Sequence, residues 1–270
     1  VGYTYDFIQK DIEEAIDGLP HTAKNVYRPD RTFGLSFKAK VQLFRRQYDE
    51  CIKTCEEALA EAKEAGHALW NMNKEYNQYA TALKQMGYPE YAIDEPQYAG
   101  MNEMVETIWK QRVTHTYDDP EQLIYLFCTN QGDPYPMYVT KSVLDLFGSS
   151  VAEKNIDLRY RFCIRYKAQH ATAPEGDQDF GTLSIKWNPC GMRLSEVYLM
   201  LAECYARKGD TESINKAMDY LDELRVCRLV KNQYTKLTAT DKDAALRCVR
   251  EERKRELFLT CNGFFDMRRF

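Results

Sequence analysis

The sequence predicts a mainly α-helical protein in which helical hairpins form a scaffold and a long loop-rich insertion with short strands interrupts it. Apolar residues recur at helical spacing through residues 1–66 and again through residues 192–270. Residues 67–191 differ, because proline and glycine turns are frequent there and all three tryptophans lie in this part. We therefore expect one domain over residues 1–270, with a helical frame made of both ends and an aromatic insertion between them.

The first predicted helix occupies the N-terminal residues. Four apolar residues keep a helical period there: Ile8, Ile12, Ile16 and Leu19. The sequence Gly18-Leu19-Pro20 then ends the helix, because proline lacks the amide hydrogen that a helix needs. Since a helix is already in progress at the first residues, we interpret the chain as part of a longer protein.

The next two predicted helices form a hairpin. One spans about residues 32–46 and the other residues 48–65, with Gly66 at its end. The join at Gln47 is short, as an antiparallel helix pair requires. Small and large packing residues fall where tetratricopeptide repeats have them: Leu35, Ala39, Tyr48, Cys51, Cys55 and Ala58.

A second hairpin of this kind is predicted near the C-terminus. Residues 193–208 form an amphipathic helix, Gly209-Asp210 turns the chain, and residues 213–229 return. The packing sides carry these residues: Leu194, Val197, Leu201, Ala202, Tyr205, Ile214, Ala217, Tyr220, Leu221 and Leu224. Two such units and their flanking helices predict a tetratricopeptide-like scaffold.

Two stretches of the insertion are predicted to be strands. Residues 122–129 are a short apolar run, and residues 157–166 alternate in polarity. Turn signals such as Gly87-Tyr88-Pro89 separate the other parts of the insertion. Loops carried on a rigid frame are where binding functions concentrate, so we expect the ligand site in this insertion.

Several classes of protein are disfavoured by composition and motifs. The formal net charge of -4 argues against a dedicated nucleic-acid binder. Phosphate loops, dinucleotide glycine patterns, HExxH and GxSxG are absent from the sequence, so we expect no cofactor and no enzyme activity. The nine cysteines and four histidines lack zinc spacing, so we expect no metal site and mostly free buried thiols.

Five segments of the chain carry a recognisable pattern, and the closing one is residues 250–270 ("REERKRELFLTCNGFFDMRRF"). Residues 193–210 ("RLSEVYLMLAECYARKGD") and 217–228 ("AMDYLDELRVCR") precede it, and residues 39–59 and 137–162 lie further upstream. These segments resemble, in order, the SusD/RagB family of Bacteroidetes outer-membrane lipoproteins, and the closing segment is the strongest match. Residues 193–210 and 217–228 resemble two consecutive family elements, residues 137–162 are similar to a further family stretch, and residues 39–59 to its tetratricopeptide-like helices. The resemblance covers most of the chain outside about 67–120.

This resemblance implies a tetratricopeptide-like scaffold packed against an irregular loop-rich part. It further implies non-enzymatic capture of a nutrient at the cell surface, usually a glycan and sometimes a peptide. The implied partner is a SusC-like TonB-dependent outer-membrane transporter. Attachment to the outer membrane would use an N-terminal lipid anchor that lies outside this sequence. A tetratricopeptide-type adaptor that binds a protein or peptide partner is the alternative interpretation.

Aromatic side chains in the turn-rich segments are the candidate ligand-binding residues. A sugar ring has C–H faces that stack on aromatic planes, and tyrosine and tryptophan also have a polar tip. The candidates are Trp187, Tyr88, Tyr91, Tyr98, Trp70 and Trp109. The alternative for each of them is that the ring packs beneath its own loop.

The closing helix has a predicted structural role. On a helical wheel Arg253 falls in the middle of an apolar arc, with Glu252 and Glu256 toward one side. We expect Arg253 to be buried and paired with a carboxylate, because an unpaired buried charge is costly. We also expect the last turns to be packed nearly all round, Gly263 to break the helix, and Phe264 and Phe265 to anchor the exit.

Overall fold

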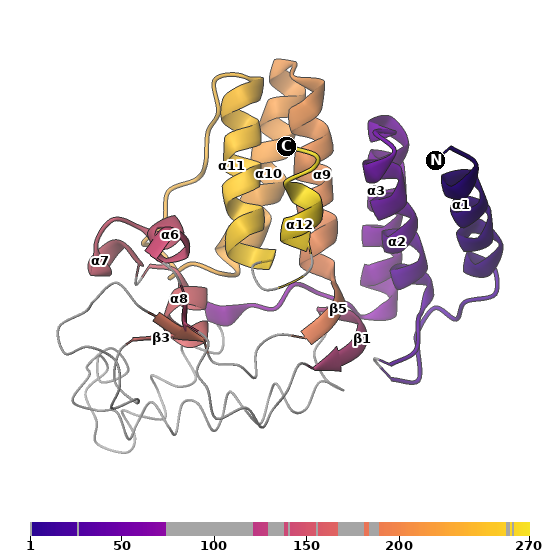
Figure 1. Cartoon of the computed structure of the whole chain (residues 1–270), viewed down its shortest axis with the longest axis horizontal. Helices are drawn as coiled ribbons and strands as arrows, with labels where there is room; N and C mark the ends of the chain where they lie inside the picture. The colour runs from indigo at the N-terminus through magenta and orange to yellow at the C-terminus, as the bar shows by residue number, and fades with distance from the viewer. Residues whose placement is uncertain are drawn as a thin grey trace.

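The computed structural model describes residues 2–25, 27–73, 121–128, 138–139, 141–154, 156–166, 181–183, 189–257, 260 and 262–270. Within these residues the fold is mainly helical with a few short strands, which confirms the predicted fold class. Figure 1 shows the long helices standing side by side, and the paired strands lie near one end of them.

The first three helices have nearly the predicted bounds: α1 (Gly2–Ile16), α2 (Arg31–Phe44) and α3 (Tyr48–Ala65). Asp30 starts α2, because its carboxylate accepts a hydrogen bond of 2.8 Å from the Phe33 amide. Gly66 ends α3 with a left-handed φ of 86°, which glycine adopts without strain. Helix α1 packs against α2 of this hairpin.

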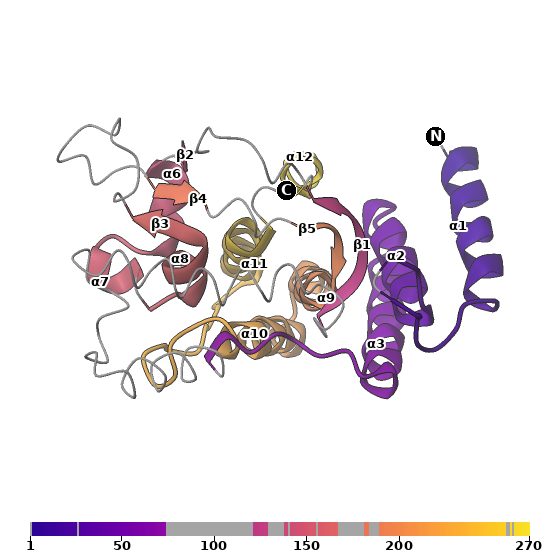
Figure 2. The same cartoon turned by 90° about the horizontal axis from the view of Figure 1, so that it is seen from below.

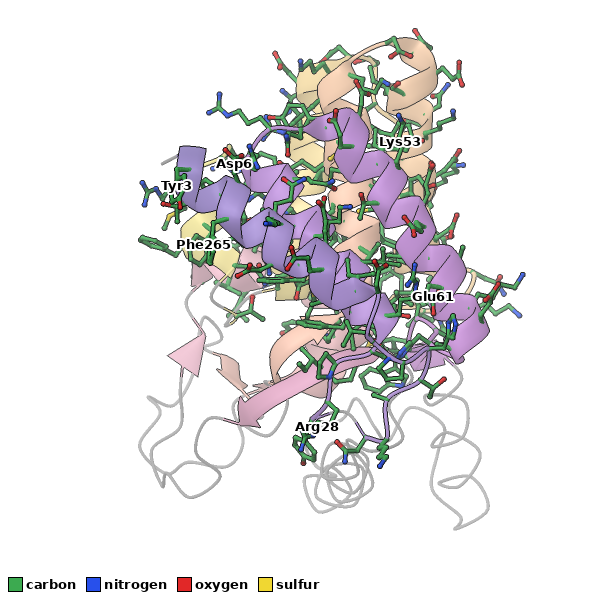
Figure 3. The ribbon with its side chains drawn as sticks, turned by 90° about the vertical axis from the view of Figure 1, so that its right-hand side faces the viewer. Tyr3, Asp6, Arg28, Lys53, Glu61 and Phe265 are labelled. Carbon is green, nitrogen blue, oxygen red and sulfur yellow. The ribbon has the colours of Figure 1, made fainter. Side chains whose placement is uncertain are left out.

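Helix α1 lies at the edge of the frame and keeps much of its surface in solvent. Its Asp6 accepts a hydrogen bond of 2.6 Å from Arg45, which directly follows α2. Ile16, at the end of α1, is buried and belongs to the main core. Tyr3 is 84% exposed, and Figure 3 shows it on the flank of the molecule that also carries Phe265.

The second hairpin is also present, as α9 (Leu194–Lys208) and α10 (Thr211–Val226). Gly209 ends α9 with a φ of 82°, and Asp210 caps α10 by accepting a 2.9 Å hydrogen bond from the Ser213 amide. The prediction of two helical hairpins is therefore confirmed.

The two hairpins share one hydrophobic core. Helix α3 packs against α9, and α11 (Lys242–Leu257) packs against α9 and α10. Small buried residues of α3 and α9 permit close approach of the helices: Cys51, Cys55, Ala58, Ala202, Cys204 and Ala206. The closing helix contributes Ala245, Val249 and Leu257 to this core. Helix α9 is thus the central element, as Figures 1 and 2 show.

A two-stranded sheet joins the frame to the insertion. β1 (Gln122–Cys128), the strand predicted from its apolar run, pairs antiparallel with β5 (Pro189–Arg193). Ile124 lies opposite Met192. A Cβ atom at Gly191 would collide with the carbonyl oxygen of Ile124, so only glycine fits at this point of the ladder.

The other short elements gather at the opposite end from α1 (Figure 2). A three-stranded sheet has the order β2-β4-β3. Its strands and the short helices beside it are β2 (Tyr138–Val139), α6 (Lys141–Leu144), a 3₁₀ turn η3 (Asp145–Phe147), α7 (Val151–Lys154), α8 (Leu158–Cys163), β3 (Ile164–Tyr166) and β4 (Gly181–Leu183).

The prediction of a strand over residues 157–166 is wrong for its first part. Residues 158–163 form α8, and only β3 at the end of the stretch is extended. The Arg159 amide donates to the Asp157 carboxylate at 2.9 Å, and the Arg159 side chain is fully buried among acidic groups. The burial of Arg159 among these acidic groups therefore outweighs the alternating polarity of the side chains, which predicted a strand.

The closing helix departs from its predicted ending. Helix α11 ends at Leu257, and Gly263 lies inside a further short helix, α12 (Asn262–Asp266). The last turns of α11 are not packed all round, because Glu251 and Lys254 are exposed. Asn262 is buried at the start of α12.

The expected anchoring role of Phe264 and Phe265 is also corrected. The two residues are 59% and 45% exposed, because α12 turns them toward the surface. Phe265 has one ring contact with α2, at 5.7 Å between its centroid and that of Phe44. Two ion pairs hold the exit instead: Asp266 of α12 with Arg253 of α11, and Arg269, which follows α12, with Glu203 of α9.

Five cysteines whose side chains the structure describes are free thiols. Cys51, Cys55 and Cys204 are buried, and Cys227 and Cys248 are half-buried. This confirms the prediction of free thiols for these five residues. Among the helices that the structure describes, none has the length and apolar character needed to cross a membrane.

Candidate functional site

The structure describes one of the six aromatic residues predicted to bind the ligand. Tyr88, Tyr91, Tyr98, Trp109 and Trp187 lie outside the described residues. Trp70 lies within the described residues.

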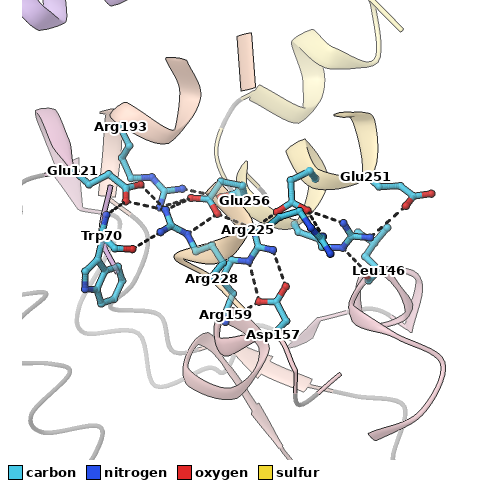
Figure 4. A network of polar contacts seen from close by, with 12 residues as sticks. Trp70, Glu121, Leu146, Asp157, Arg159, Arg193, Arg225, Arg228, Glu251 and Glu256 are labelled. Atoms are coloured by element: carbon cyan, nitrogen blue, oxygen red, sulfur yellow. Dashed lines mark hydrogen bonds and ion pairs between the residues drawn. The ribbon is translucent and has the colours of Figure 1, made fainter. Parts of the chain in front are cut away.

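Trp70 is only 6% exposed, so its ring does not present an open face to a sugar. Its amide donates a hydrogen bond of 2.6 Å to Oε2 of Glu121, and its carbonyl oxygen accepts one of 2.6 Å from Nη1 of Arg228. Figure 4 shows these contacts at the edge of a larger polar network. For Trp70, the interpretation as a packed residue therefore describes the geometry better than a stacking platform does.

Arg228 is the centre of this network. Its side chain is fully buried, two residues after the end of α10. Nη2 donates to both carboxylate oxygens of Glu121 at 2.7 and 2.8 Å. Nε and Nη2 donate to the Glu256 carboxylate at 3.1 and 2.9 Å. Such charge-assisted, forked bonds fix both position and orientation.

A second buried arginine extends the network toward α8. Arg159 is held by Asp157 at 2.7 Å, and its Nη1 lies 2.8 Å from both Glu256 and Glu252 of α11. Arg193, at the end of β5, donates to the Glu256 carbonyl oxygen at 2.7 Å. Three elements far apart in the sequence thus converge on the last turns of α11 (Figure 4).

Two less buried arginines complete what we call the buried charge cluster. Arg225 and Arg255 donate to Glu252 at 3.0 and 2.9 Å, and Nε of Arg255 donates to the carbonyl oxygen of Leu146 at 2.5 Å. The cluster contains Arg159, Arg193, Arg225, Arg228 and Arg255 with Glu121, Asp157, Glu252 and Glu256.

The arginines keep the buried carboxylates ionised. Burial by itself would raise the pKa of Glu252, but the charges of Arg159, Arg255 and Arg225 outweigh burial and lower this pKa to about 2. Burial by itself would also raise the pKa of Glu256. The neighbouring arginines, Arg228 above all, hold this pKa well below its usual range. A glycosidase needs a carboxylic acid that stays protonated, so Glu252 and Glu256 are unsuited to that role.

A separate group of ion pairs, the α12 cluster, lies on another side of α11. Arg253 is 3% exposed and donates to both oxygens of Asp266 at 2.8 Å. Arg269 holds Glu203 of α9 at 2.7 and 2.8 Å, and Asp266 at 2.9 Å. Arg253 is thus buried and paired, as the wheel predicts, and its carboxylate partner is Asp266. Glu256 instead belongs to the buried charge cluster.

Sequence reasoning missed most of the buried charge cluster. Two of its arginines lie at the ends of segments that carry the family resemblance. Arg228 is the last residue of segment 217–228, and Arg193 is the first residue of segment 193–210. Charged residues at the ends of otherwise apolar helices were the available signal. Glu121, which pairs with Arg228, and Asp157, which pairs with Arg159, lie in the insertion, and nothing in the local pattern links them to α11.

The described residues define a class of protein: a tetratricopeptide-like helical frame that buried ion pairs join to Glu121 and Asp157, two residues between its helical hairpins. The model of the SusD family matches residues 69–270. That range includes every residue of the buried charge cluster and all but the first two residues of the insertion. The chain therefore belongs to the SusD family.

Solved structures of low sequence identity have a similar fold. A SusD-like protein from Bacteroides fragilis NCTC 9343 is 15% identical with a TM-score of 0.65, over 98% of this chain and 59% of that one. A SusD superfamily protein from Bacteroides vulgatus ATCC 8482 is 16% identical with a TM-score of 0.63, over 97% of this chain and 56% of that one.

A putative sugar binding protein, also from Bacteroides vulgatus ATCC 8482, is 19% identical with a TM-score of 0.59, over 95% of this chain and 51% of that one. The chain thus spans between 51% and 59% of the length of these three structures. No curated protein matches the chain.

Proposed function

We propose that this chain is the core of a protein that captures a nutrient, most often a glycan, at the bacterial cell surface without catalysing a reaction on it. Membership of the SusD family over residues 69–270 is the observation that carries this proposal. A structural neighbour described as a putative sugar binding protein supports glycan over peptide as the ligand.

The proposed ligand site uses aromatic side chains of the insertion. Trp187, Tyr88, Tyr91, Tyr98 and Trp109 offer planar faces for the C–H surfaces of sugar rings. The polar tips of the tyrosines would hydrogen-bond to hydroxyl groups at the ring edges.

The proposed route continues from capture to transport. The captured ligand passes to a SusC-like TonB-dependent transporter in the outer membrane, and the full-length protein is held there by an N-terminal lipid anchor. Family membership supports this route, and copurification of the full-length protein with a transporter of this type from outer membranes tests it. Isolation of the full-length protein from the cytosol, without a transporter, would contradict it.

A glycan array with the purified chain tests the ligand class, and isothermal titration calorimetry then gives the affinity for each hit. We expect Trp187→Ala to weaken binding by about 1–3 kcal/mol, by analogy with the loss found when an aromatic side chain that stacks on a nucleic-acid base is replaced by alanine. Tyr3→Ala is the matched control, because Tyr3 is an aromatic residue on α1 that is 84% exposed.

Three results would contradict the proposal. Binding that survives alanine at Trp187 and at all three loop tyrosines removes the proposed site. Released reducing sugar in the binding reactions shows catalysis. Retention of peptides on a peptide array, with none of the glycans retained, would support the adaptor interpretation that the helical hairpins also allow.

A further inference from the structure

Three buried cysteines meet where the two helical hairpins pack together. Cys51 and Cys55 lie one turn apart on α3, and Cys204 lies on α9, the helix against which α3 packs. All three residues are 0% exposed. The sulfur atoms of Cys51 and Cys55 are 3.9 Å apart, and the Cys51 thiol also forms a hydrogen bond with the Cys204 thiol. We call these three residues the thiol cluster.

Helix geometry separates the two pairs of thiols that Cys51 makes. A disulfide needs Cβ atoms about 3.5–4.5 Å apart. Side chains one turn apart on a helix have Cβ atoms about 5–6 Å apart, so the pair of Cys51 and Cys55 does not meet this requirement. Cys51 and Cys204 come from different helices, and the distance between them depends on how closely α3 and α9 pack. Ala58 and Ala202, small buried residues of the same two helices, permit a close approach.

A bond between Cys51 and Cys204 would join the two hairpins of the frame. Cys51 belongs to the hairpin of α2 and α3, and Cys204 belongs to the hairpin of α9 and α10. The bond would close a loop of about 150 residues, and closing so long a loop restricts the unfolded chain strongly. Disulfides persist in oxidising surroundings such as the bacterial periplasm and the cell surface. The cross-link therefore suits a protein at the location proposed above.

We propose that Cys51 and Cys204 are a modification site: a disulfide oxidant converts them to an interhelical disulfide that locks the two helical hairpins together. The free thiols of the structure are the reduced form of this site. Cys55 stays a thiol in the oxidised form, because its position on the same helix as Cys51 disfavours a bond between them. The proposal goes beyond the proposed function, and it holds whether or not the chain binds a glycan.

The reaction is thiol–disulfide exchange with a small disulfide such as oxidised glutathione. The Cys51 thiolate attacks one glutathione sulfur, which forms a mixed disulfide and releases one glutathione thiolate. The Cys204 thiolate then attacks the sulfur of Cys51, and the second glutathione leaves as a thiolate. The two released thiolates take up the two protons that the cysteines lose. Two cysteine thiols are thus oxidised to one disulfide, and one glutathione disulfide is reduced to two thiols.

Burial decides when this exchange takes place. Glutathione does not reach a sulfur atom that is 0% exposed, so the first step occurs while α3 and α9 are apart, during folding or transient opening. Packing of the two helices then brings Cys204 to Cys51. The same packing leaves no room for the glutathione on Cys51, so the fold itself favours the second step.

Oxidative refolding is the first measurement. The chain is unfolded and reduced in urea, refolded in a buffer of reduced and oxidised glutathione, blocked with N-ethylmaleimide and digested with trypsin without reduction. Trypsin cuts after Lys53, so Cys51 and Cys55 fall in separate peptides. Mass spectrometry should find the Cys51 peptide joined to the Cys204 peptide, and Cys55 blocked by N-ethylmaleimide. Another partner for Cys51, a glutathione that stays on it, or a blocked Cys51 overturns the proposal.

The melting temperature of the oxidised and reduced proteins is the second measurement. Cys204→Ala removes one partner of the disulfide. Cys55→Ala is the matched control, because Cys55 is equally buried and also contacts Cys51. We expect oxidation to raise the melting temperature by about 10 °C in the wild type and in Cys55→Ala, since the cross-link restricts the unfolded chain, and to leave Cys204→Ala unchanged. An equal rise in Cys204→Ala, or no rise in Cys55→Ala, overturns the proposal.

Discussion

Arg253 and Glu256 are one helical turn apart on α11, yet they belong to different ion-pair clusters. Arg253 bonds Asp266 of α12 at 2.8 Å, whereas Glu256 bonds Arg228 at 2.9 Å. Opposite charges at this spacing commonly pair with each other on an exposed helix. Here each is buried and each receives its partner from another element, so α11 joins the helical frame to the insertion on one side and to the C-terminus on the other.

Glu256→Gln should be strongly destabilising. The variant leaves Arg228 and Arg159 buried with fewer counter-charges, and breaking such a pair costs about 3–5 kcal/mol. Urea unfolding followed by circular dichroism measures the loss. Glu251→Gln is the control on the same helix, because the Glu251 side chain is 55% exposed, and it should change stability by less than about 0.5 kcal/mol. Equal effects of the two variants would contradict the inferred burial of Glu256.

Acid should weaken the fold partly through Glu252. Its pKa is about 2 in the folded protein against an ordinary value of 4.5, so its stabilising contribution is fully present above about pH 4.5 and is lost as the pH falls toward 2. The contribution amounts to about 3 kcal/mol. Unfolding free energies measured from pH 7 to pH 3 should fall less steeply below pH 4.5 for Glu252→Gln than for the wild type. Parallel curves would show that Glu252 is not held ionised by its arginines.

Asp30 should stabilise the start of α2 through two bonds. One carboxylate oxygen accepts the Phe33 amide at 2.8 Å, and the other lies 2.6 Å from Nε2 of His67. Asp30→Ala should cost about 1–2 kcal/mol in the free energy of unfolding, since it removes the cap. Asp30→Asn retains an oxygen that can cap the helix and should cost less. An asparagine variant as unstable as the alanine variant would assign the effect to the His67 contact instead.

Thiol reactivity should follow burial. A hydrogen bond to Cys51 and burial both raise the pKa of the Cys204 thiol, so this thiol is inaccessible and un-ionised in the native protein. Cys51 and Cys55 are equally buried, whereas Cys227 and Cys248 are half-buried. Iodoacetamide followed by peptide mass spectrometry should therefore modify Cys248 and Cys227 first, and all five only in urea. Early modification of Cys204 in native protein would contradict this order.

The exposed aromatics of α12 should contribute little to stability. Phe264 is 59% exposed, so Phe264→Ala should change the free energy of unfolding by no more than about 0.5 kcal/mol. Leu257→Ala, at a residue that is 2% exposed in the main core, should cost about 2–5 kcal/mol. Chemical denaturation of both variants checks the contrast. A large loss in Phe264→Ala would restore the anchoring role that the sequence suggested.

Local patterns were sufficient for the elements of the frame. The helical period of the apolar residues and the end signals at Gly66 and Gly209 predict the two hairpins that the structure contains. The apolar run at 122–129 likewise predicts β1. Each of these features depends on which face of the element is buried. The apolar residues that form this face lie within a few positions of one another in the sequence.

Local patterns failed where charges are buried. Residues 158–163 are helical because Arg159 reaches acidic groups of α11, which alternation of polarity does not reveal. Phe264 is apolar and was expected to be packed, yet it is exposed because α12 turns it away from the core. In both cases the outcome depends on the neighbours supplied by distant segments.

The sequence alone was enough to predict the helical frame and the resemblance to the SusD family, because both rest on residue order over short spans. The contact of Arg228 with Glu121, 107 residues away, and the contact of Trp70 with both of them became apparent only in the folded chain. A buried charge has no preferred partner along the chain. It takes whichever opposite charge the packing of the helices brings within hydrogen-bond distance.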